Sequence, residues 1–141
     1  MSTEAKIPSP IEVIETMDMA ANHGDMVNIL NLFTDDATIT FQQPFPPFQP
    51  SYQGKDQIRS FLQSLITKEY HVTSSNIRVA GNEVTWDSKI KSQALQQLGI
   101  DEAQVTSHAV LWGSLIQSWA ITPSQEMVQK AQASMAAQGQ R

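Results

Sequence analysis

Cysteine is absent from this 141-residue sequence, which excludes disulfides, thiolate metal sites and a cysteine nucleophile. Long apolar runs are absent too, since no stretch approaches the roughly 18 residues that a membrane-spanning helix needs. The opening residues, MSTEAKIPSP, are too polar for a signal peptide. We therefore expect a cytoplasmic protein that has no membrane partner.

Positive charge is scarce. Nine Lys and Arg stand against fourteen Asp and Glu, so the formal net charge is −5, and the basic residues are scattered. Nucleic-acid binding needs clustered Lys and Arg, so no such partner is expected. The three histidines, His23, His71 and His108, lack the spacing of metal ligands, and no glycine-rich phosphate loop is present. We expect neither a metal nor a cofactor.

Helical patterns with clear start signals occupy much of the first half. The sequence SPIE at 9–12 is a capping box with proline at the first helical position, and it predicts a helix to about Asn22. Asp25 is suited to cap a second helix, and Gly54 precedes a third, strongly amphipathic one. The apolar stripes expected to be buried are Ile14, Met17 and Ala21, then Met26, Val27, Ile29, Leu30 and Phe33, then Ile58, Phe61, Leu62, Leu65 and Ile66.

β-branched, alternating segments dominate the second half. Strands are predicted at 37–41, 70–80, 84–94, 105–111 and 115–121, with turns at 34–36, 81–82 and 113–114. A second capping box at Thr122 predicts a closing helix that is apolar at Met127, Val128, Ala131 and Met135. Because helices and strands come in separate runs, the pattern indicates one α+β domain over 9–138, preceded by a loose arm at 1–8.

Four prolines fall within residues 44–50 and forbid both a helix and a central strand there. The resulting loop is stiff and presents Phe45 and Phe48. These phenylalanines either cover the hydrophobic core or line the mouth of a pocket.

Three motifs together resemble the NTF2-like superfamily, and within it the SnoaL-like branch of polyketide cyclase and ketosteroid isomerase relatives. They are NHGD at 22–25, LFTDDATI at 32–39 and GKDQIRSFL at 54–62, followed by long strands. The resemblance implies a curved, largely antiparallel (mixed) sheet wrapped around three helices from the N-terminal half plus a C-terminal helix. It also implies a conical cavity and, frequently, a dimer formed through the sheet. It says little about function, because that fold carries enzymes, binding proteins and interaction modules.

The family's catalytic positions can be tested residue by residue. By resemblance, the isomerase base falls at Phe41, the tyrosine acid at Met17, and the second acid near Ser107 or His108. Proton transfer needs a titratable group within reach of the substrate, so chemistry of the isomerase type is contradicted. The cyclase route also lacks its carboxylate, because no Asp or Glu lies between Glu102 and Glu126.

Two polar residues on the predicted strands require separate interpretation. Asp87 shares a strand face with Lys89 and Lys91, which favours an exposed cross-strand ion pair. His108 lies between apolar residues, where an imidazole is either a structural group or a weak candidate for a catalytic base.

The sequence therefore predicts a cavity protein that binds a small apolar molecule, and it leaves catalytic activity undecided. The ligand-binding residues expected are Met17, Phe41, Trp86 and His108, with Phe45 and Phe48 near the mouth. If His108 points to solvent or the cone is packed solid, this hypothesis gives way to a non-catalytic dimerisation or protein-interaction module. A divergent cyclase or hydrolase is the third alternative.

Apolar residues on both faces of the 104–121 hairpin indicate cover on both sides. Helices can cover one side only, so a homodimer through the sheet is expected. Trp112 at the hairpin turn suggests a contact surface or a pocket rim.

Overall fold

The computed structural model describes residues 9–43, 48–66, 70–97, 99–130 and 133. The elements are α1 (Pro10–Asn22), α2 (Met26–Leu30), β1 (Phe33–Phe41), β2 (Ser51–Gln53), α3 (Gly54–Leu65), β3 (His71–Ala80), β4 (Glu83–Lys91), α4 (Gln93–Gln96), β5 (Ala103–Trp112) and β6 (Leu115–Pro123). Residues 125–130 are also helical. The predicted arm at 1–8 and Phe45 lie outside the described residues.

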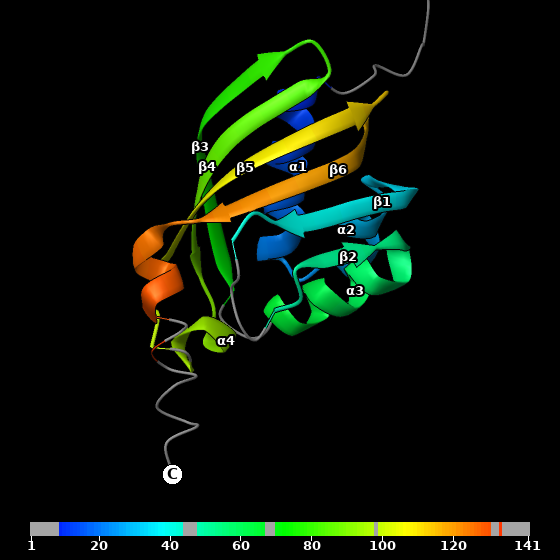
Figure 1. Ribbon diagram of the computed structural model, residues 1–141. Helices are drawn as coiled ribbons and strands as arrows, with labels where there is room; N and C mark the ends of the chain where they lie inside the picture. The colour runs from blue at the N-terminus through cyan, green and yellow to red at the C-terminus, as the bar shows by residue number, and fades with distance from the viewer. Residues whose placement is uncertain (1–8, 44–47, 67–69, 98, 131–132, 134–141) are drawn as a thin grey trace, which may run out of the picture.

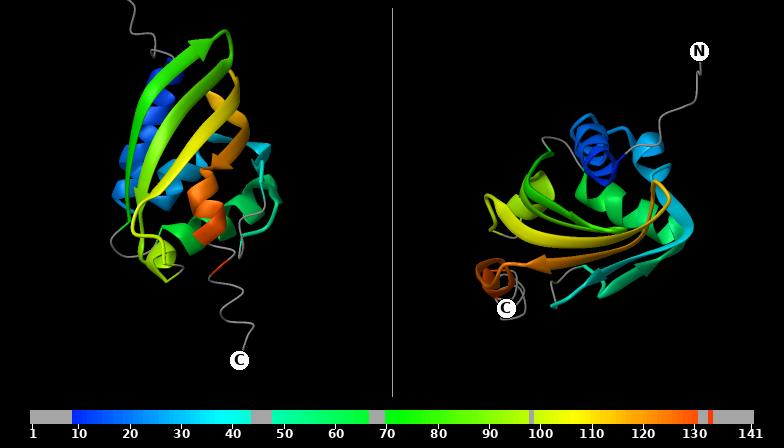
Figure 2. Two further views of the ribbon diagram at one scale, coloured as in Figure 1. Left: turned by 60° about the vertical axis from the view of Figure 1, so that its left-hand side comes forward. Right: turned by 90° about the horizontal axis from the view of Figure 1, so that it is seen from above.

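The strands form one six-stranded sheet in the order β2-β1-β6-β5-β4-β3. Neighbouring strands pair antiparallel except β1 and β6, which run parallel. The sheet is curved, and α1 and α3 lie against its concave side (Figures 1 and 2). The predicted α+β class, with a mixed curved sheet wrapped around helices, is confirmed.

The helix starts follow the capping chemistry expected from the sequence. The Ser9 hydroxyl accepts from the Glu12 backbone N–H at 3.3 Å, and the Glu12 carboxylate accepts from the Ser9 N–H at 3.2 Å. Asp25 caps α2 in the same manner by accepting from the Asn28 N–H at 3.3 Å. These bonds satisfy N–H groups that a helix leaves unpaired at its start, so the positions of α1 and α2 are fixed locally.

The turn predicted at 34–36 is a bulge within β1. The pairing with β6 moves from Phe33–Ile116 to Thr38–Ser118, so β1 advances five residues while β6 advances two. The Thr34 hydroxyl donates to the Asp36 carboxylate at 2.9 Å inside this irregular stretch. The short polar side chains do bend the backbone as expected, but the strand continues past them.

The hydrophobic core lies between the concave face and the helices. Phe33, Ile58, Phe61 and Leu62 are all buried, as predicted. Phe33 begins β1 and does not belong to α2, and the expectation that Val27 would be buried is wrong, because its side chain is 70% exposed. On the sheet side, the inward faces of β4 and β5 contribute a set of buried residues that includes Val84, Trp86, Ala109 and Leu111.

The closing helix begins later than its predicted cap. Pro123 is the last residue of β6 and pairs with Val105, so the strand continues through Thr122. The Ser124 hydroxyl accepts from the Met127 N–H at 3.3 Å and therefore provides the cap. Met127 and Val128 are buried as expected, whereas Ala131 and Met135 lie outside the described residues.

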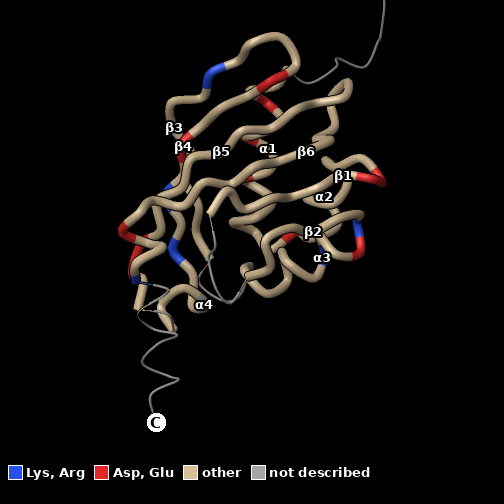
Figure 3. The backbone as a smooth tube through the Cα atoms, viewed as in Figure 1, with Lys and Arg blue, Asp and Glu red and all other residues tan. Residues whose placement is uncertain are grey.

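Within the described part of the chain, no helix is both long enough and apolar enough to cross a membrane. Lys and Arg are dispersed along the described backbone without gathering on one element (Figure 3). This dispersal agrees with the scattered basic residues of the sequence.

Candidate functional site

A cavity lies between the helices and the concave face of the sheet. Its volume is about 60 Å³, measured as the space open to the centre of a water molecule. One water needs about 10–15 Å³ on this measure, so the space corresponds to only a few water molecules. Apolar and aromatic side chains make up nearly all of the wall, and Asp18, Tyr70 and Ser88 interrupt it.

Four of the predicted ligand-binding residues line this cavity. They are Met17 on α1, Phe41 at the end of β1, Phe48 before β2, and Trp86 on β4. Phe41 reaches its place because β1 pairs with β6, where Phe41 is opposite Ile121. The residues that stand at the isomerase base and tyrosine positions by resemblance thus do face the cavity, but both are apolar.

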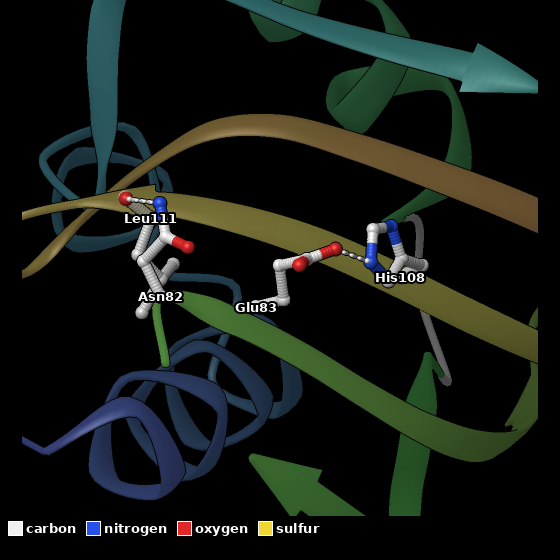
Figure 4. A network of polar contacts seen from close by, with 4 residues as sticks. All are labelled: Asn82, Glu83, His108 and Leu111. Atoms are coloured by element: carbon white, nitrogen blue, oxygen red, sulfur yellow. Dashed lines mark hydrogen bonds and ion pairs between the residues drawn. The ribbon is translucent and has the colours of Figure 1, made fainter. Parts of the chain in front are cut away.

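His108 does not line the cavity, and the expectation that it would is wrong. Along β5, Ser107 and Ala109 are inward and fully buried, so His108 between them faces the opposite side of the sheet. Its side chain is 45% exposed, and its Nε2 lies 2.8 Å from Glu83 Oε1 on the neighbouring strand. Figure 4 shows the imidazole turned toward this carboxylate. Of the two positions considered for a second acid, only Ser107 points inward.

An aromatic cluster forms one wall of the cavity. The Phe41, Phe48 and Phe61 ring centroids lie 5.7–5.8 Å from one another, with Phe41 and Phe48 stacked and Phe61 edge-on to both. Tyr52 adds a further contact to Phe61 at 4.7 Å. Phe48 therefore fills both roles left open by the sequence, because it packs against the core and also lines the pocket.

The polar end of the cavity is built around Asp18. The carboxylate accepts hydrogen bonds from the Ser74 hydroxyl and backbone N–H on β3. The Ser74 hydroxyl also lies 3.1 Å from that of Ser88 on β4. Burial raises the pKa of the Asp18 carboxyl, although the bonds from Ser74 lower it in part. The carboxyl is thus shifted toward its neutral form, which can donate a hydrogen bond.

Tyr70 shares this end of the cavity. Burial raises the pKa of its hydroxyl, and the nearby Asp18 charge adds to the shift. The phenol therefore stays protonated at neutral pH and keeps its donor. Sequence reasoning missed both residues. A signal for Asp18 existed, because it lies four residues after Ile14 and three before Ala21, on a helical face with buried neighbours.

Asp87 lies on the other side of the sheet from the cavity, as expected from strand alternation. Its carboxylate accepts from Asn76 Nδ2 at 2.9 Å and from the Thr106 hydroxyl at 3.1 Å. These two bonds lower the pKa of Asp87. Asp87 does form cross-strand polar contacts, as predicted. Its partners are the hydrogen-bond donors Asn76 and Thr106, and not the lysines of its own strand face.

Among the described residues, no group of three His, Asp or Glu side chains could hold a metal ion. The cavity is an apolar chamber with one carboxyl, one phenol and one serine hydroxyl at its wall.

The arrangement of a curved sheet around helices with a chamber between them defines the NTF2-like class of fold. The sequence signature of the SnoaL-like domain matches residues 13–109, and the chain belongs to this family. No curated protein shows significant sequence similarity to the chain.

Solved structures of similar shape support the fold assignment. An NTF2-like protein of unknown function from Cytophaga hutchinsonii has a TM-score of 0.67 at 10% identity, covering 89% of this chain and 96% of that one. A protein with a cystatin-like fold from Methylobium petroleophilum has a TM-score of 0.70 at 15% identity, with coverages of 85% and 78%. A protein with a ketosteroid isomerase-like fold from Catenulispora acidiphila, in complex with trimethylamine, has a TM-score of 0.65 at 18% identity, with coverages of 83% and 88%. At these identities the similarity concerns the fold alone.

Proposed function

We propose that this protein binds a small, largely apolar molecule in the cavity between its helices and its sheet. The observation that carries the proposal is the composition of the wall, which is almost entirely apolar. It includes Met17 and Phe41, which by resemblance stand at the family's acid and base positions. Removing apolar ligand surface from water stabilises a complex by about 25 cal/mol per Å². Pockets of this composition, mostly apolar with a few placed polar groups, are typical small-molecule sites.

The size of the cavity restricts the ligand. An engineered apolar cavity of about 150 Å³ accommodates benzene, whereas this one measures about 60 Å³. The ligand is therefore compact, or only its apolar end enters. The hypothesis drawn from the sequence required His108 in the cavity, and in that form it fails because His108 faces the opposite side of the sheet. The proposal rests instead on the open space in the cone and on Asp18 and Tyr70, the groups at its wall that can orient the polar part of a ligand.

Family chemistry based on carboxylates at the isomerase positions is not part of the proposal, since neither Met17 nor Phe41 can exchange a proton. If the protein is a divergent enzyme, Asp18 is the candidate for proton transfer, because its carboxyl is at the cavity wall.

A titration followed by the indole N–H resonances tests the binding proposal. Isobutene is an apolar probe with four carbons, smaller than benzene, and it should shift the indole resonances of Trp86 and Trp119, which line the cavity, while leaving that of the 70%-exposed Trp112 in place. Ala21→Leu adds volume at the cavity wall and should weaken binding at least tenfold. Ala80→Leu makes the same change at an exposed position on β3 that does not line the cavity, and it serves as the matched control. Equal binding by both variants would contradict the proposal.

The second candidate function is self-association through the convex face of the sheet. The observation that favours it is Trp112, a large aromatic residue at 70% exposure, paired across the β5–β6 hairpin with the half-buried Leu115. An interface of standard size would bury about 800 Å² per subunit. Sedimentation at micromolar concentration should give a dimer that Trp112→Ser weakens. A wild-type species of 15.6 kDa alone would exclude the dimer.

A further inference from the structure

The Asp18 carboxyl lies at the wall of the apolar cavity without a positive group beside it. No Lys, Arg or His is found among the described residues that line the cavity. The ion pairs formed by the described residues do not include Asp18 either. Buried charges in proteins are normally paired, because a charge removed from water loses its hydration. Within the part of the chain that the structure describes, an ionised Asp18 therefore has no counter-ion.

Hydrogen bonds from the sheet hold this carboxyl as an acceptor. Ser74 on β3 donates to it from both its hydroxyl and its backbone N–H. The Ser88 hydroxyl on β4 lies 3.1 Å from the Ser74 hydroxyl, so it can donate to the oxygen whose own proton points at Asp18. A carboxylate has about four lone-pair sites, and the two bonds from Ser74 use only two of them. The remaining sites suit a ligand group that donates.

Aromatic rings lie near the same end of the cavity. Trp86 and Ser88 are alternate residues on the inward face of β4, and both line the cavity. Alternate residues of a strand lie about 7 Å apart. The Trp86 indole in turn stacks on that of Trp119 at 6.1 Å. Tyr70 is close enough for the Asp18 charge to raise the pKa of its hydroxyl. The faces of such rings attract cations.

The other charges around Asp18 also favour a positive ligand. Glu15, three residues earlier on α1, adds a negative charge that acts on Asp18, and α1 contains no basic residue. The inward residues of β3 and β4 at this end, which include Val72 and Trp86, are uncharged. The register places the ionisable residues of these two strands on the opposite face of the sheet: His71, Arg78, Glu83, Asp87, Lys89 and Lys91.

We propose that the cavity binds a compact alkylammonium ion, whose charge pairs with Asp18 and whose alkyl group occupies the apolar chamber. This inference rests on the proposed function and adds the polar group of the ligand. In the unliganded protein, burial shifts the Asp18 carboxyl toward its neutral form, and a cation bound beside it would stabilise the carboxylate. The loss of hydration of the ammonium group is offset by the ion pair, its hydrogen bonds and the aromatic faces.

Isobutylamine and isobutanol are a matched pair of probes, because each joins one isobutyl group to one polar atom. The amine is protonated at pH 7, as a lysine side chain is, and the alcohol is uncharged. Binding is followed by the indole N–H resonances of Trp86 and Trp119, which line the cavity. Isobutylamine should bind at least about tenfold more tightly than isobutanol, as expected for hydrogen bonds to a charged group.

Asp18→Asn removes the charge and keeps the size of the side chain. It should weaken isobutylamine binding about ten- to hundredfold and leave isobutanol binding nearly unchanged. Asp87→Asn is the matched control, because it removes the same charge from the other side of the sheet, where Asp87 contacts Thr106. This control should keep the preference for the amine.

A titration of the carboxyl carbons in ¹³C-labelled wild-type protein adds a readout that a structural role of Asp18 would not affect. Bound isobutylamine should lower the pKa of the Asp18 carboxyl, because a nearby cation favours the carboxylate. Isobutanol carries no charge and should not lower it. An Asp18 pKa that is the same with and without bound amine would show that the ammonium group lies elsewhere.

The failure of this inference can be distinguished from the failure of the proposed function. If isobutene shifts the Trp86 and Trp119 resonances while isobutylamine binds no more tightly than isobutanol, the ammonium inference is wrong and the proposed function stands. If Asp18→Asn and Asp87→Asn weaken amine binding equally, the amine responds only to the overall charge of the protein and the inference is wrong. If none of the three probes shifts these resonances, the proposed function fails and the inference fails with it.

Discussion

Replacing Phe61 with alanine should destabilise the protein by about 3–5 kcal/mol. Phe61 is 2% exposed, and its ring contacts Phe41 at 5.8 Å, Phe48 at 5.7 Å and Tyr52 at 4.7 Å. Burial of a phenylalanine side chain accounts for about 1.5–3 kcal/mol. The remainder comes from the space left behind and from three aromatic contacts, each worth about 0.5–1.5 kcal/mol beyond area burial.

Urea unfolding followed by tryptophan fluorescence measures this loss, with an unchanged dependence on urea as the sign that the unfolded state is unaffected. Phe61→Leu keeps most of the volume and should cost less than about 1.5 kcal/mol. A loss below about 1 kcal/mol for Phe61→Ala would refute the placement of α3, because truncation of a phenylalanine to alanine at a packed core site costs about 3–5 kcal/mol.

The same variant should also enlarge the ligand cavity. The space vacated by Phe61 joins the existing 60 Å³, so benzene should now enter. At ten times its dissociation constant, benzene should restore about 1.4 kcal/mol of the lost stability, and it should stabilise the wild type less. Equal stabilisation of both proteins would show that benzene binds elsewhere.

Three further predictions concern the cavity and the helix that borders it. Folding raises the pKa of the Asp18 carboxyl above its ordinary value of 3.8. The folded protein therefore binds this proton more tightly than the unfolded chain does, and the free energy of unfolding falls as the pH rises from about 3.8 through the raised pKa. Asp18→Asn should therefore be more stable than wild type in urea unfolding at pH 7, with the gap closing below pH 3.8; a gap independent of pH would contradict this. Asn22→Ala should cost about 1–3 kcal/mol in the same assay, because the Asn22 amide accepts from Val72 N at 2.7 Å and donates to Val72 O at 3.0 Å. A β,γ-unsaturated ketosteroid should not be isomerised, because by resemblance Phe41 stands at the position of the isomerase base and cannot accept a proton. Isomerisation that disappears when a cavity residue is mutated would overturn this prediction.

Long, periodic elements could be predicted from the sequence, while short or irregular ones could not. The helical faces of α1 and α3 and the alternation in β3 to β6 are local patterns that survive in the folded protein. β2 spans only Ser51–Gln53, too short to show alternation, and it exists because it pairs with β1. The bulge in β1 is likewise defined by its pairing with β6, a partner that local sequence does not reveal.

The same distinction explains the site. Met17, Phe41 and Trp86 could be assigned to the cavity because each belongs to a pattern with a clear inward face. His108 could not, because both faces of β5 carry apolar residues and the alternation alone does not say which face is inward. Asp18 was missed for a different reason. A carboxyl at a buried helical face is unfavourable in isolation, and only the tertiary contact with Ser74 on β3 makes it tolerable.

The parallel pairing of β1 with β6 has a consequence for synthesis on the ribosome. Thr38 and its partner Ser118 lie about 80 residues apart in the chain. At about 5–20 residues per second, the nascent chain carries β1 without its central neighbour for roughly 4–16 s. An open strand edge can pair with other chains, and bulges and charged side chains oppose such pairing. Asp35 and Asp36 place two adjacent carboxylates on β1, and their charge should oppose such pairing during the interval before β6 emerges.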